Sequence, residues 1–490
     1  MRPLSALLIM TLAGPVWAAD KLNVLMIAVD DLRPQLGCTG DPIVKSPHID
    51  ALAGRGVLFE RAYCQQAVCS PSRSSLMTGC RPDTTKVYDL VTHFRTALPD
   101  VVTVSQLFKQ HGYHTQGLSK IYHPGYDDEP SWSVPHWAPK KPGYGPEGLA
   151  IQKKAREEAA EKAGEPPAKA KAKAKAKAKA KAAQPARGPA WEAADVADDD
   201  LPDGATAAHA CEVLREIKDK PFFLAVGFHK PHLPFVSPKK YWELYKPEQI
   251  KLADNPFFPK NAPSYAPHNS GELRAYYGIP KTGPVSDDQA RSLMHGYFAA
   301  TSYTDACIGR VLAELDKLGL REKTVVVLWG DHGWQLGEHA MWCKHCNYET
   351  STHSLLIVSA PGKSPVGVKS TALVEFVDIY PTLAALCGLP APATCEGTSF
   401  VPLLDDPAKP WKAAAFSQYP RGQRKGYAMR TDRFRLVEWR MKDGEPEYEL
   451  YDHASDPAEN ENVASKPEYA AQLRELTTQL RAGWKGALPK

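Results

Sequence analysis

The chain has 490 residues, of which 43% are hydrophobic and 24% are charged, close to the average for soluble globular proteins. This length allows two or three domains, and the composition excludes collagen-like, coiled-coil and wholly disordered chains. The net charge of +4 is unevenly spread, because residues 151–187 contain 12 basic and 4 acidic side chains and the rest of the chain therefore carries about −4. Nucleic-acid-binding proteins usually present a basic folded surface, so we predict no nucleic-acid partner.

The N-terminus has the pattern of a secretory signal peptide. Arg2 precedes a short apolar run that ends in small residues at Ala18 and Ala19. The run is too short to span a bilayer, and no later stretch reaches the roughly 18 apolar residues that a membrane-spanning helix needs. We expect residues 1–19 to be removed, the mature protein to be periplasmic or secreted, and no stable membrane insertion; a buried N-terminal helix is the alternative.

After the signal, continuous apolar runs that predict buried strands alternate with helical patterns. In chain order we predict a strand at Asn23–Val29, helices at Pro47–Leu52 (with Ser46 as N-cap), Val101–His111 and Ala207–Asp219, a strand at Phe222–Phe228, a helix at Ser286–Gly319, and strands at Thr324–Trp329 and Leu355–Ser359. This alternation predicts an α/β fold with a mostly parallel sheet between helices.

Two regions depart from this pattern. Residues 151–187 include alternating Ala and Lys, which predicts a solvated, disordered insertion; an anchor to an acidic polymer is the alternative. From about residue 405, short runs at 426–430, 434–439 and 448–451 predict an antiparallel sheet, followed by a helix at 467–484. We therefore predict a main domain over residues 20–404 and a small C-terminal α+β subdomain over residues 405–490.

The ten cysteines do not have the spacing of a small disulfide-stapled scaffold. Cys343 and Cys346 form a Cys-x-x-Cys motif, but no second such pair stands nearby to complete a zinc site. A local disulfide or free thiols are therefore expected there.

Polar residues follow three of the predicted buried strands: Asp30 and Asp31, then His229, then Asp331 and His332. In open α/β sheets the ligand crevice lies beyond the carboxyl ends of the strands, so these side chains can converge. Three carboxylates in one crevice stay ionised only if a cation neutralises them, and oxygen-rich ligation favours Ca²⁺ or Mg²⁺ over zinc. The alternative is that the Asp30–Asp31 pair only caps the segment that follows it.

The segment from Cys69 to Gly79 combines a cysteine with a helix start. Ser70 is the predicted cap and Pro71 occupies the first turn, so an anion at Cys69 would face free N–H groups and the positive end of the helix dipole. Arg73, one turn further on, can reach the same point. A structural cysteine is the alternative.

The pattern Cys-x-Pro-x-Arg followed by Thr-Gly resembles the signature of the sulfatase family, in which the cysteine is oxidised to formylglycine. The stretches Asp30–Pro34, Asp331–Trp334 and Gly337–His339 also match. The resemblance is closest to the iduronate-2-sulfatase branch, and rests there on Gln65–Cys69, Arg81–Thr85, Phe228–His232 and Ser417–Arg421. It runs from about Asn23 to near Asn462, interrupted by the Ala/Lys-rich insertion.

The resemblance implies an alkaline-phosphatase-like core that forms the catalytic domain, and a bound calcium ion. The expected calcium ligands are Asp30, Asp31, Asp331, His332 and the modified Cys69. Most sulfatases have Asn where this chain has His332, which agrees with the iduronate-2-sulfatase branch. The side chains expected around the sulfate are Arg73, Lys120, His123, His229 and Lys344, and those expected to touch the sugar are Trp334 and His232.

The mechanism that the resemblance implies begins with the hydrated aldehyde at residue 69, one hydroxyl of which attacks sulfur. His229, assisted by Lys344, would protonate the leaving oxygen, and His123 would remove the remaining hydroxyl proton. The implied partners are a formylglycine-generating enzyme and a sulfated glycan, with the 2-O-sulfate of a uronic acid as the expected ester.

Several alternatives remain open from the sequence. Lys120 taken alone reads as a surface lysine, and His339, His345 and His353 are treated as structural or supporting residues. Among functions, the alternatives are a phosphodiester or phosphonate hydrolase of the same fold and a sulfated-glycan-binding protein that lacks the conversion of Cys69.

Overall fold

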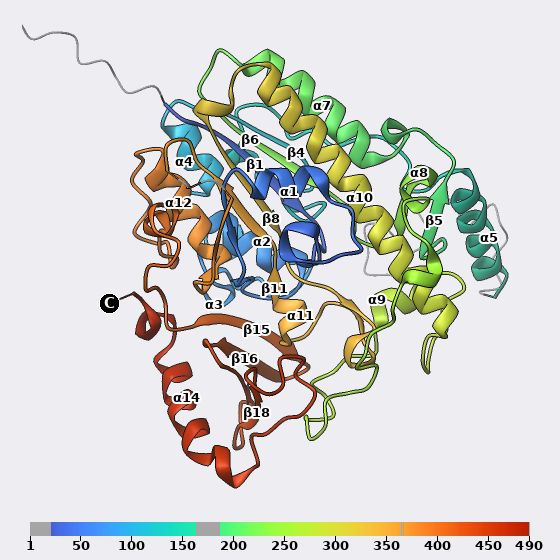
Figure 1. Cartoon of the computed structure of the whole chain (residues 1–490), viewed down its shortest axis with the longest axis vertical. Helices are drawn as coiled ribbons and strands as arrows, with labels where there is room; N and C mark the ends of the chain where they lie inside the picture. Colours follow the sequence, from blue (N-terminus) through green and yellow to red (C-terminus); the bar gives the residue numbers. More distant parts are fainter. Residues whose placement is uncertain (1–20, 163–186, 364, 366, 490) are drawn as a thin grey trace, which may run out of the picture.

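The computed structural model describes residues 21–162, 187–363, 365 and 367–489 of the chain (Figure 1). The predicted signal peptide and residues 163–186 of the predicted insertion lie outside these described residues. None of the helices in the described part is both long enough and apolar enough to cross a membrane.

A seven-stranded sheet forms the centre of the molecule and contains all four buried strands predicted from the sequence. In spatial order its strands are β13 (Val368–Ser370), β2 (Val57–Phe59), β12 (Leu356–Ser359), β8 (Thr324–Gly330), β1 (Asn23–Val29), β6 (Phe222–Phe228) and β4 (His114–Ser119). β8, β1, β6 and β4 are parallel to one another, whereas β12 is antiparallel to both of its neighbours. The predicted α/β fold with a mostly parallel sheet is therefore confirmed.

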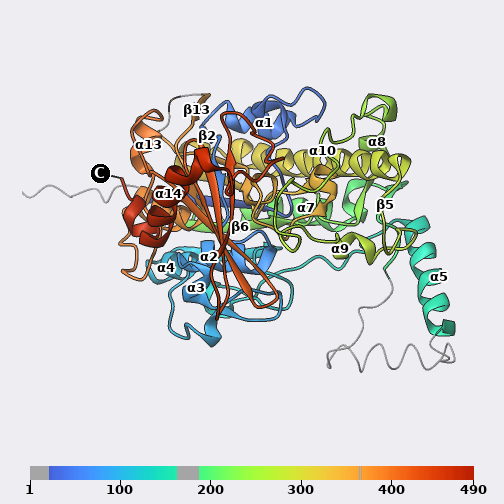
Figure 2. The same cartoon turned by 90° about the horizontal axis from the view of Figure 1, so that it is seen from below.

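Helices cover both faces of this sheet because the middle strands are apolar on both faces. Leu25 and Ile27 of β1 pack into one hydrophobic core, while Val24 and Met26 pack into a second core on the opposite face. The first core is closed by α1 (Pro47–Ala53), α7 (Pro202–Ile217) and α10 (Asp287–Lys317), and the second by α2 (Cys69–Thr78), α4 (Val104–Gln110) and α12 (Ile379–Leu386). Figure 2 shows α1 and α10 on one side of the sheet and α2 and α4 on the other.

The predicted helices are present, but the hydroxyl groups at their starts do not all act as expected. Ser286 caps α10 with its side chain. Ser46 precedes α1, but its hydroxyl donates to the carboxylate of Asp50 and accepts no capping hydrogen bond from the helix. Ser70 is not the cap of α2, because this helix begins one residue earlier, at Cys69.

Short elements connect these layers. They are β3 (Ala62–Tyr63), α3 (Pro82–Thr85), β5 (Trp191–Ala194), β7 (Phe235–Pro238), α8 (Lys239–Trp242), α9 (Gly271–Arg274), β9 (Gln335–Leu336), β10 (Trp342–Cys343), α11 (Glu349–Thr352), β11 (His353–Ser354), β14 (Val374–Glu375) and α13 (Val401–Asp405). Three of them form a small sheet in the order β11-β3-β14.

The C-terminal part is a four-stranded antiparallel sheet with one long helix packed on it. Its strands, in spatial order, are β15 (Ala415–Arg421), β16 (Arg424–Arg430), β17 (Phe434–Arg440) and β18 (Glu447–Asp452). Helix α14 (Ala470–Ala482) places Leu476 and Leu480 against Met429 and Leu436 of this sheet in a separate hydrophobic core. The sequence predicted the last three strands and the helix, but not β15.

The prediction of disorder from residue 151 is wrong at its start. Residues 151–162 belong to helix α5 (Pro146–Lys162), which lies at the edge of the molecule (Figure 2). Glu192 of β5 fixes the start of this helix, because its carboxylate accepts the N–H groups of Gly145 and Gly148, each at 2.8 Å. The stretch 151–162 is rich in Ala, Glu, Lys and Arg, which are strong helix formers.

Candidate active site

The ends of β1 and β8 bring three aspartates together. These parallel neighbours pair in register, with Val29 opposite Gly330. Asp30 and Asp31 follow β1 and therefore lie beside Asp331, which follows β8. The backbone N–H of Asp31 donates to Oδ1 of Asp331 at 3.0 Å, and all three carboxylates are fully buried.

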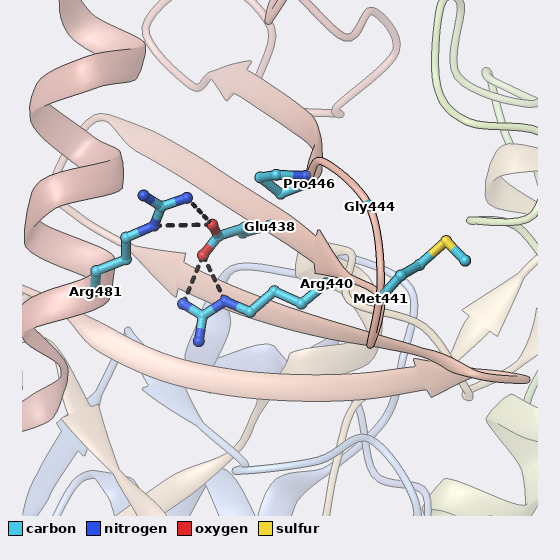
Figure 3. Close-up of a pocket in the computed structure, with 6 residues that line it drawn as sticks. All are labelled: Glu438, Arg440, Met441, Gly444, Pro446 and Arg481. Atoms are coloured by element: carbon cyan, nitrogen blue, oxygen red, sulfur yellow. Dashed lines mark hydrogen bonds and ion pairs between the residues drawn. The ribbon is translucent and has the colours of Figure 1, made fainter.

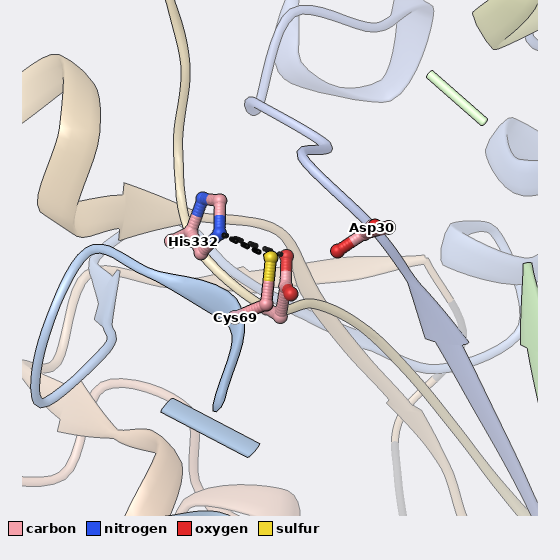
Figure 4. Close-up of side chains that lie close together, drawn as sticks. Asp30, Cys69 and His332 are labelled. Atoms are coloured by element: carbon pink, nitrogen blue, oxygen red, sulfur yellow. Dashed lines mark hydrogen bonds and ion pairs between the residues drawn. The ribbon is translucent and has the colours of Figure 1, made fainter. Parts of the chain in front are cut away.

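Cys69, the first residue of α2, lies against this group. Its Sγ is 3.5 Å from Nε2 of His332 (Figure 4). It is 4.0 Å from Nζ of Lys120. The side chain is 2% exposed, and burial together with the Asp30 carboxylate raises the pKa of the thiol well above its ordinary value. The unmodified residue is therefore a protonated thiol at neutral pH and not an activated thiolate.

Arg73 joins the aspartates to the segment that follows β4. Its Nε donates to Oδ2 of Asp331 at 2.9 Å, and Nη2 donates to Oδ1 of Asp30 at 3.2 Å. Nη1 donates to the backbone carbonyl groups of Lys120 and, at 3.2 Å, Ile121. The guanidinium group is fully buried, so in this arrangement it orients the two carboxylates and the segment that carries Lys120.

Two buried lysines face the aspartates. Nζ of Lys120 contacts the carboxylate of Asp30, and Nζ of Lys344 lies 3.0 and 3.1 Å from the two carboxylate oxygens of Asp31. Burial alone would lower the pKa values of both lysines, but the neighbouring carboxylates outweigh burial, so both pKa values are raised and both groups are ammonium ions. Lys344 also contacts Glu272 at 3.0 Å.

The donor set fits a divalent cation. Asp30, Asp331, His332 and Cys69 each place a ligand atom within 4.8 Å of the others. Asp31 forms a second such group with Asp30, Cys69 and His232. Burial and the neighbouring Asp30 carboxylate, opposed by Lys344, raise the pKa of Asp31 to about 8. A bound cation would stabilise the ionised form, and carboxylate oxygens are the ligands that Ca²⁺ and Mg²⁺ prefer.

The charges of the whole cluster support the same conclusion. The carboxylates of Asp30, Asp31, Asp331 and Glu272 face three buried cations, those of Arg73, Lys120 and Lys344. With all four carboxylates ionised, as a bound cation would favour, the cluster has one uncompensated negative charge. A divalent cation would make it positive, which suits the binding of an anionic ester.

A cavity of about 520 Å³ opens beside this buried group. Among the residues that line it are Lys120, His123, His229 and His232. Cys69 is not among the lining residues and lies behind Lys120, whose ammonium group is in contact with Asp30. The cavity therefore brings a ligand to the lysine and histidines first and to residue 69 beyond them.

The two histidines with proposed proton-transfer roles have different surroundings. Burial and the Lys120 ammonium group lower the pKa of His123 to about 4, and its buried Nδ1 has no hydrogen-bond partner among the described residues. Burial also lowers the pKa of His229, although Asp203 opposes this effect. His123 is therefore neutral over most of the pH range, and His229 has a partner that favours its protonated form.

Trp334 does not lie where a sugar contact would require it. Its ring is fully buried in the core, stacked on Tyr297, and its face carries the ammonium group of Lys344 at 4.7 Å. It supports Lys344 from behind and is not open to the cavity. His232 does line the cavity, with Nε2 3.1 Å from Glu272.

Two residues of the site carried no signal in the sequence. Glu272 lies on the four-residue helix α9 and reaches Lys344 and His232. Asp203 lies in the first turn of α7 and accepts hydrogen bonds from backbone N–H groups at the end of β6. Neither residue follows a buried strand or belongs to a motif, so only the folded chain brings them to the site.

A second cavity, of about 330 Å³, lies in the C-terminal sheet and contains none of the predicted site residues. Its central acid, Glu438, is held by Arg440 and Arg481 through hydrogen bonds of 2.5 to 3.0 Å (Figure 3). Because its charge is already compensated, this pocket offers no reactive group.

Comparisons with known proteins point to one family. The sulfatase family model matches residues 22–389, and the model of the N-sulphoglucosamine sulphohydrolase C-terminal region matches residues 337–485. Iduronate 2-sulfatase of Mus musculus is 34% identical over 542 residues, covering 94% of this chain and 94% of the relative. Iduronate 2-sulfatase of Homo sapiens is 34% identical over 501 residues, covering 86% and 85%.

The solved structures support the same fold. A phosphonate monoester hydrolase from Silicibacter pomeroyi matches with a TM-score of 0.73 at 22% identity, covering 96% of both chains. A protein solved in complex with its substrate D-glucosamine-2-N,6-O-disulfate also matches with a TM-score of 0.73, at 21% identity, covering 95% of this chain and 98% of the other. At these identities the likeness concerns the fold.

The chain belongs to the sulfatase family. It is a sulfuric ester hydrolase and resembles iduronate 2-sulfatase over most of its length.

Proposed function

We propose that this protein is an exported, formylglycine-dependent sulfatase that hydrolyses a sulfate ester of a sulfated glycan. The 2-O-sulfate of a uronic acid is the substrate we favour, because the relatives with 34% identity are iduronate 2-sulfatases. The observation that carries the proposal is the setting of Cys69. It is a buried, protonated thiol at the start of a helix, next to Asp30, Lys120 and His332.

Such a thiol is a poor nucleophile, and its surroundings suit an oxygen nucleophile better. Conversion of Cys69 to formylglycine by a formylglycine-generating enzyme would place a hydrated aldehyde at this point, which supplies a hydroxyl group for attack on sulfur. We propose Asp30, Asp31, Asp331, His332 and the modified residue 69 as ligands of a calcium ion. When bound, this ion would supply positive charge that polarises the ester and favours an ionised hydroxyl group.

The residues of the chain itself would bind the sulfate group and move the protons. Lys120 and Lys344 carry permanent charge in a buried site, where they stabilise the sulfuryl oxygens as charge shifts during S–O cleavage. Arg73 holds Asp30, Asp331 and the Lys120 segment in place. His229 lines the cavity and would donate a proton to the leaving sugar oxygen.

His123 would act as the base that removes the remaining hydroxyl proton. With a pKa of about 4 it is neutral at pH 5 and above, as a base must be. His232 would contact the sugar, since it lines the cavity beside His229. The predicted signal peptide over residues 1–19 and the domain boundary near residue 405 remain part of the proposal.

The test is peptide mass spectrometry across Cys69, on protein from a host that makes formylglycine, with a sulfate-release assay on the same sample. We expect conversion of the thiol to the aldehyde, hydrolysis of an aryl sulfate, loss of activity with a chelator, and cleavage of a 2-O-sulfated uronate disaccharide. The matched control is Cys64→Ser, which alters a buried cysteine outside the cluster. Cys69→Ser expressed in the same host should be inactive.

Two results would contradict the proposal. A converted Cys69 in a protein that cleaves phosphodiesters or phosphonates and leaves sulfate esters intact would identify a phospho- or phosphonate-ester hydrolase. An unmodified thiol together with binding of sulfated glycans and no turnover would identify a binding protein.

A further inference from the structure

Asp203 is a buried carboxylate beside the cavity that belongs neither to the aspartate cluster nor to the group proposed to bind sulfate. It lies in the first turn of α7 and is 1% exposed. Its Oδ1 accepts the backbone N–H of His229 at 2.9 Å, and its Oδ2 accepts the N–H of Lys230 at 2.7 Å. These two bonds fix the carboxylate against the chain directly after β6.

The same carboxylate faces the ring of His229. Nδ1 of His229 lies 3.6 Å from Oδ1 of Asp203 and 3.3 Å from Oγ of Ser119. Ser119 ends β4 with a φ of 59°, in the left-handed region. The ring lines the cavity, and 34% of the side chain is exposed. Because Nδ1 faces these two oxygens, the opposite edge of the ring, which carries Nε2, faces the cavity.

Three charged groups on the elements packed around this imidazole act on it electrostatically. They are Asp203 from α7, Lys120 from the segment after β4, and Asp30 from the end of β1. Burial and Lys120 disfavour the imidazolium form, and the largest opposing contribution comes from Asp203. Asp203 is therefore the main group that opposes the lowering of the His229 pKa and so favours the protonated ring.

We propose that Asp203 is a positioning residue that keeps a proton on Nδ1 of His229, stabilises the imidazolium form and presents Nε2–H to the leaving oxygen of the ester. The inference rests on the proposed function, in which His229 is the acid. As the S–O bond breaks, its electron pair stays on the sugar oxygen and the proton on Nε2 passes to that oxygen. His229 then remains neutral with its Nδ1 proton and regains the second proton from water. A carboxylate behind an imidazole fixes the tautomer and stabilises the imidazolium in this way.

The test compares Asp203→Asn with the wild-type enzyme on two sulfate esters. An aryl sulfate such as 4-nitrophenyl sulfate has a leaving group that departs without a proton, whereas a sugar sulfate needs one. General acid catalysis contributes roughly 100-fold or more, so we expect kcat to fall by about that factor on the sugar sulfate and by less than about 10-fold on the aryl sulfate. On the sugar sulfate, the decline of kcat with rising pH should begin at a lower pH, because the imidazolium has lost its anionic partner.

Asp305→Asn is the matched control. Asp305 of α10 is also 1% exposed, and its carboxylate also accepts two consecutive backbone N–H groups, those of His48 and Ile49 at 3.1 and 2.7 Å. It has no contact with His229, so its variant should lose stability without changing the ratio of the two rates. Asp203→Glu, which keeps the charge, should restore part of the pH profile.

A purely structural Asp203 would give a different result. If Asp203→Asn loses kcat equally on both esters and has a pH profile like that of Asp305→Asn, the inference is overturned, but the proposed function stands because the wild-type enzyme is active. A wild-type protein without sulfatase activity would instead contradict the proposed function. If Asp203→Asn does not fold, ¹⁵N NMR of the wild-type histidines decides, with His229 assigned by a His229→Gln variant. The neutral ring should carry its proton on Nδ1, and a proton on Nε2 would overturn the inference.

Discussion

Each charged side chain of the candidate site has a buried partner of opposite charge. Lys344 lies between Asp31 and Glu272, and its ammonium group also rests on the ring face of Trp334. Glu272 contacts His232 as well, at 3.1 Å. When one partner of a buried pair is removed, the other is left buried and unpaired, which costs more than the pair itself contributes. Single substitutions here should therefore change the positions and the protonation of their neighbours.

Glu272→Gln tests this at one of the two residues that the sequence did not reveal. The variant removes the second counter-charge of Lys344 and the acid partner of His232, so Lys344 is held less firmly and His232 loses its orientation toward the cavity. We expect kcat/KM on a sulfate ester to fall by roughly 10-fold or more, since a hydrogen bond to a charged group contributes about 1.5–3 kcal/mol. Steady-state kinetics measure this. Glu243→Gln, at an exposed glutamate directly after α8, is the control, and an equal effect in both variants would exclude the role of Glu272.

His123 leads to a pH prediction. Burial and Lys120 lower its pKa to about 4, so it is neutral above this pH and protonated below it. A base must be neutral, and kcat/KM should therefore fall as the pH falls through about 4. The pH profile of kcat/KM on an aryl sulfate measures this limb. His123→Ala should lower the rate and abolish the limb, and a limb that stays at about 4 in the variant would assign it to another group.

At the scale of elements, a buried ion network ties the core to the C-terminal sheet. Glu375, at the end of β14, pairs with Arg81 at 2.7 Å and with Lys412 at 2.8 Å, and it accepts the backbone N–H of Phe416 in β15. Lys412 also contacts Asp378 at 2.6 Å. The network joins the start of α3, the segment before α12 and the first C-terminal strand, all of which are far apart in the sequence.

Lys412→Met should reveal the strength of this link. The methionine keeps much of the apolar volume and leaves Asp378 and Glu375 without their shared ammonium group. Breaking a buried pair in this way costs about 3–5 kcal/mol, so the melting temperature should fall by several degrees. Thermal unfolding measures the change. Lys363→Met is the matched control, because Lys363 and Asp405 form a half-exposed pair at 3.6 Å, worth about 1 kcal/mol or less. Similar shifts in both variants would show that the network contributes little.

At the scale of the whole molecule, the predictable features were those that follow from local sequence. Continuous apolar runs predicted β1, β6, β8 and β12 because strands buried on both faces need apolar residues on both faces. The parallel order of β8, β1 and β6 then brings Asp30 and Asp331 together at one edge of the sheet. Helix α5 was hidden by the Ala/Lys alternation that follows it in the sequence.

Other features depend on contacts between distant segments and could not be predicted. Glu272 and Asp203 reach the site from a four-residue helix and a first helical turn, without a motif. Trp334 directly follows the aspartate segment in sequence, yet the fold turns its ring into the core. Trp334 was therefore placed wrongly because it is close to the aspartates in the sequence. Glu272 and Asp203 were not predicted because neither belongs to a motif.

The proposed calcium site should stabilise the whole fold, because its ligands come from the ends of β1 and β8 and the start of α2. Any ion that binds only the folded state stabilises it, by about 2.7 kcal/mol at 100 times its dissociation constant. We expect millimolar Ca²⁺ to raise the melting temperature by a few degrees and a chelator to reverse the rise.

The decisive measurement is how far calcium raises the melting temperature of two variants. Each rise is taken relative to the same variant without calcium, so a change in basal stability does not affect it. Asp31→Asn removes a proposed ligand and should abolish the shift. Glu349→Gln is the control, because Glu349 forms a separate group of possible ligands with His453 and Glu459, in which Arg430 and Arg435 already pair with its carboxylate. In Glu349→Gln, calcium should raise the melting temperature by as much as in the wild type. A shift that survives in Asp31→Asn, or disappears in Glu349→Gln, would place the calcium ion away from the strand ends.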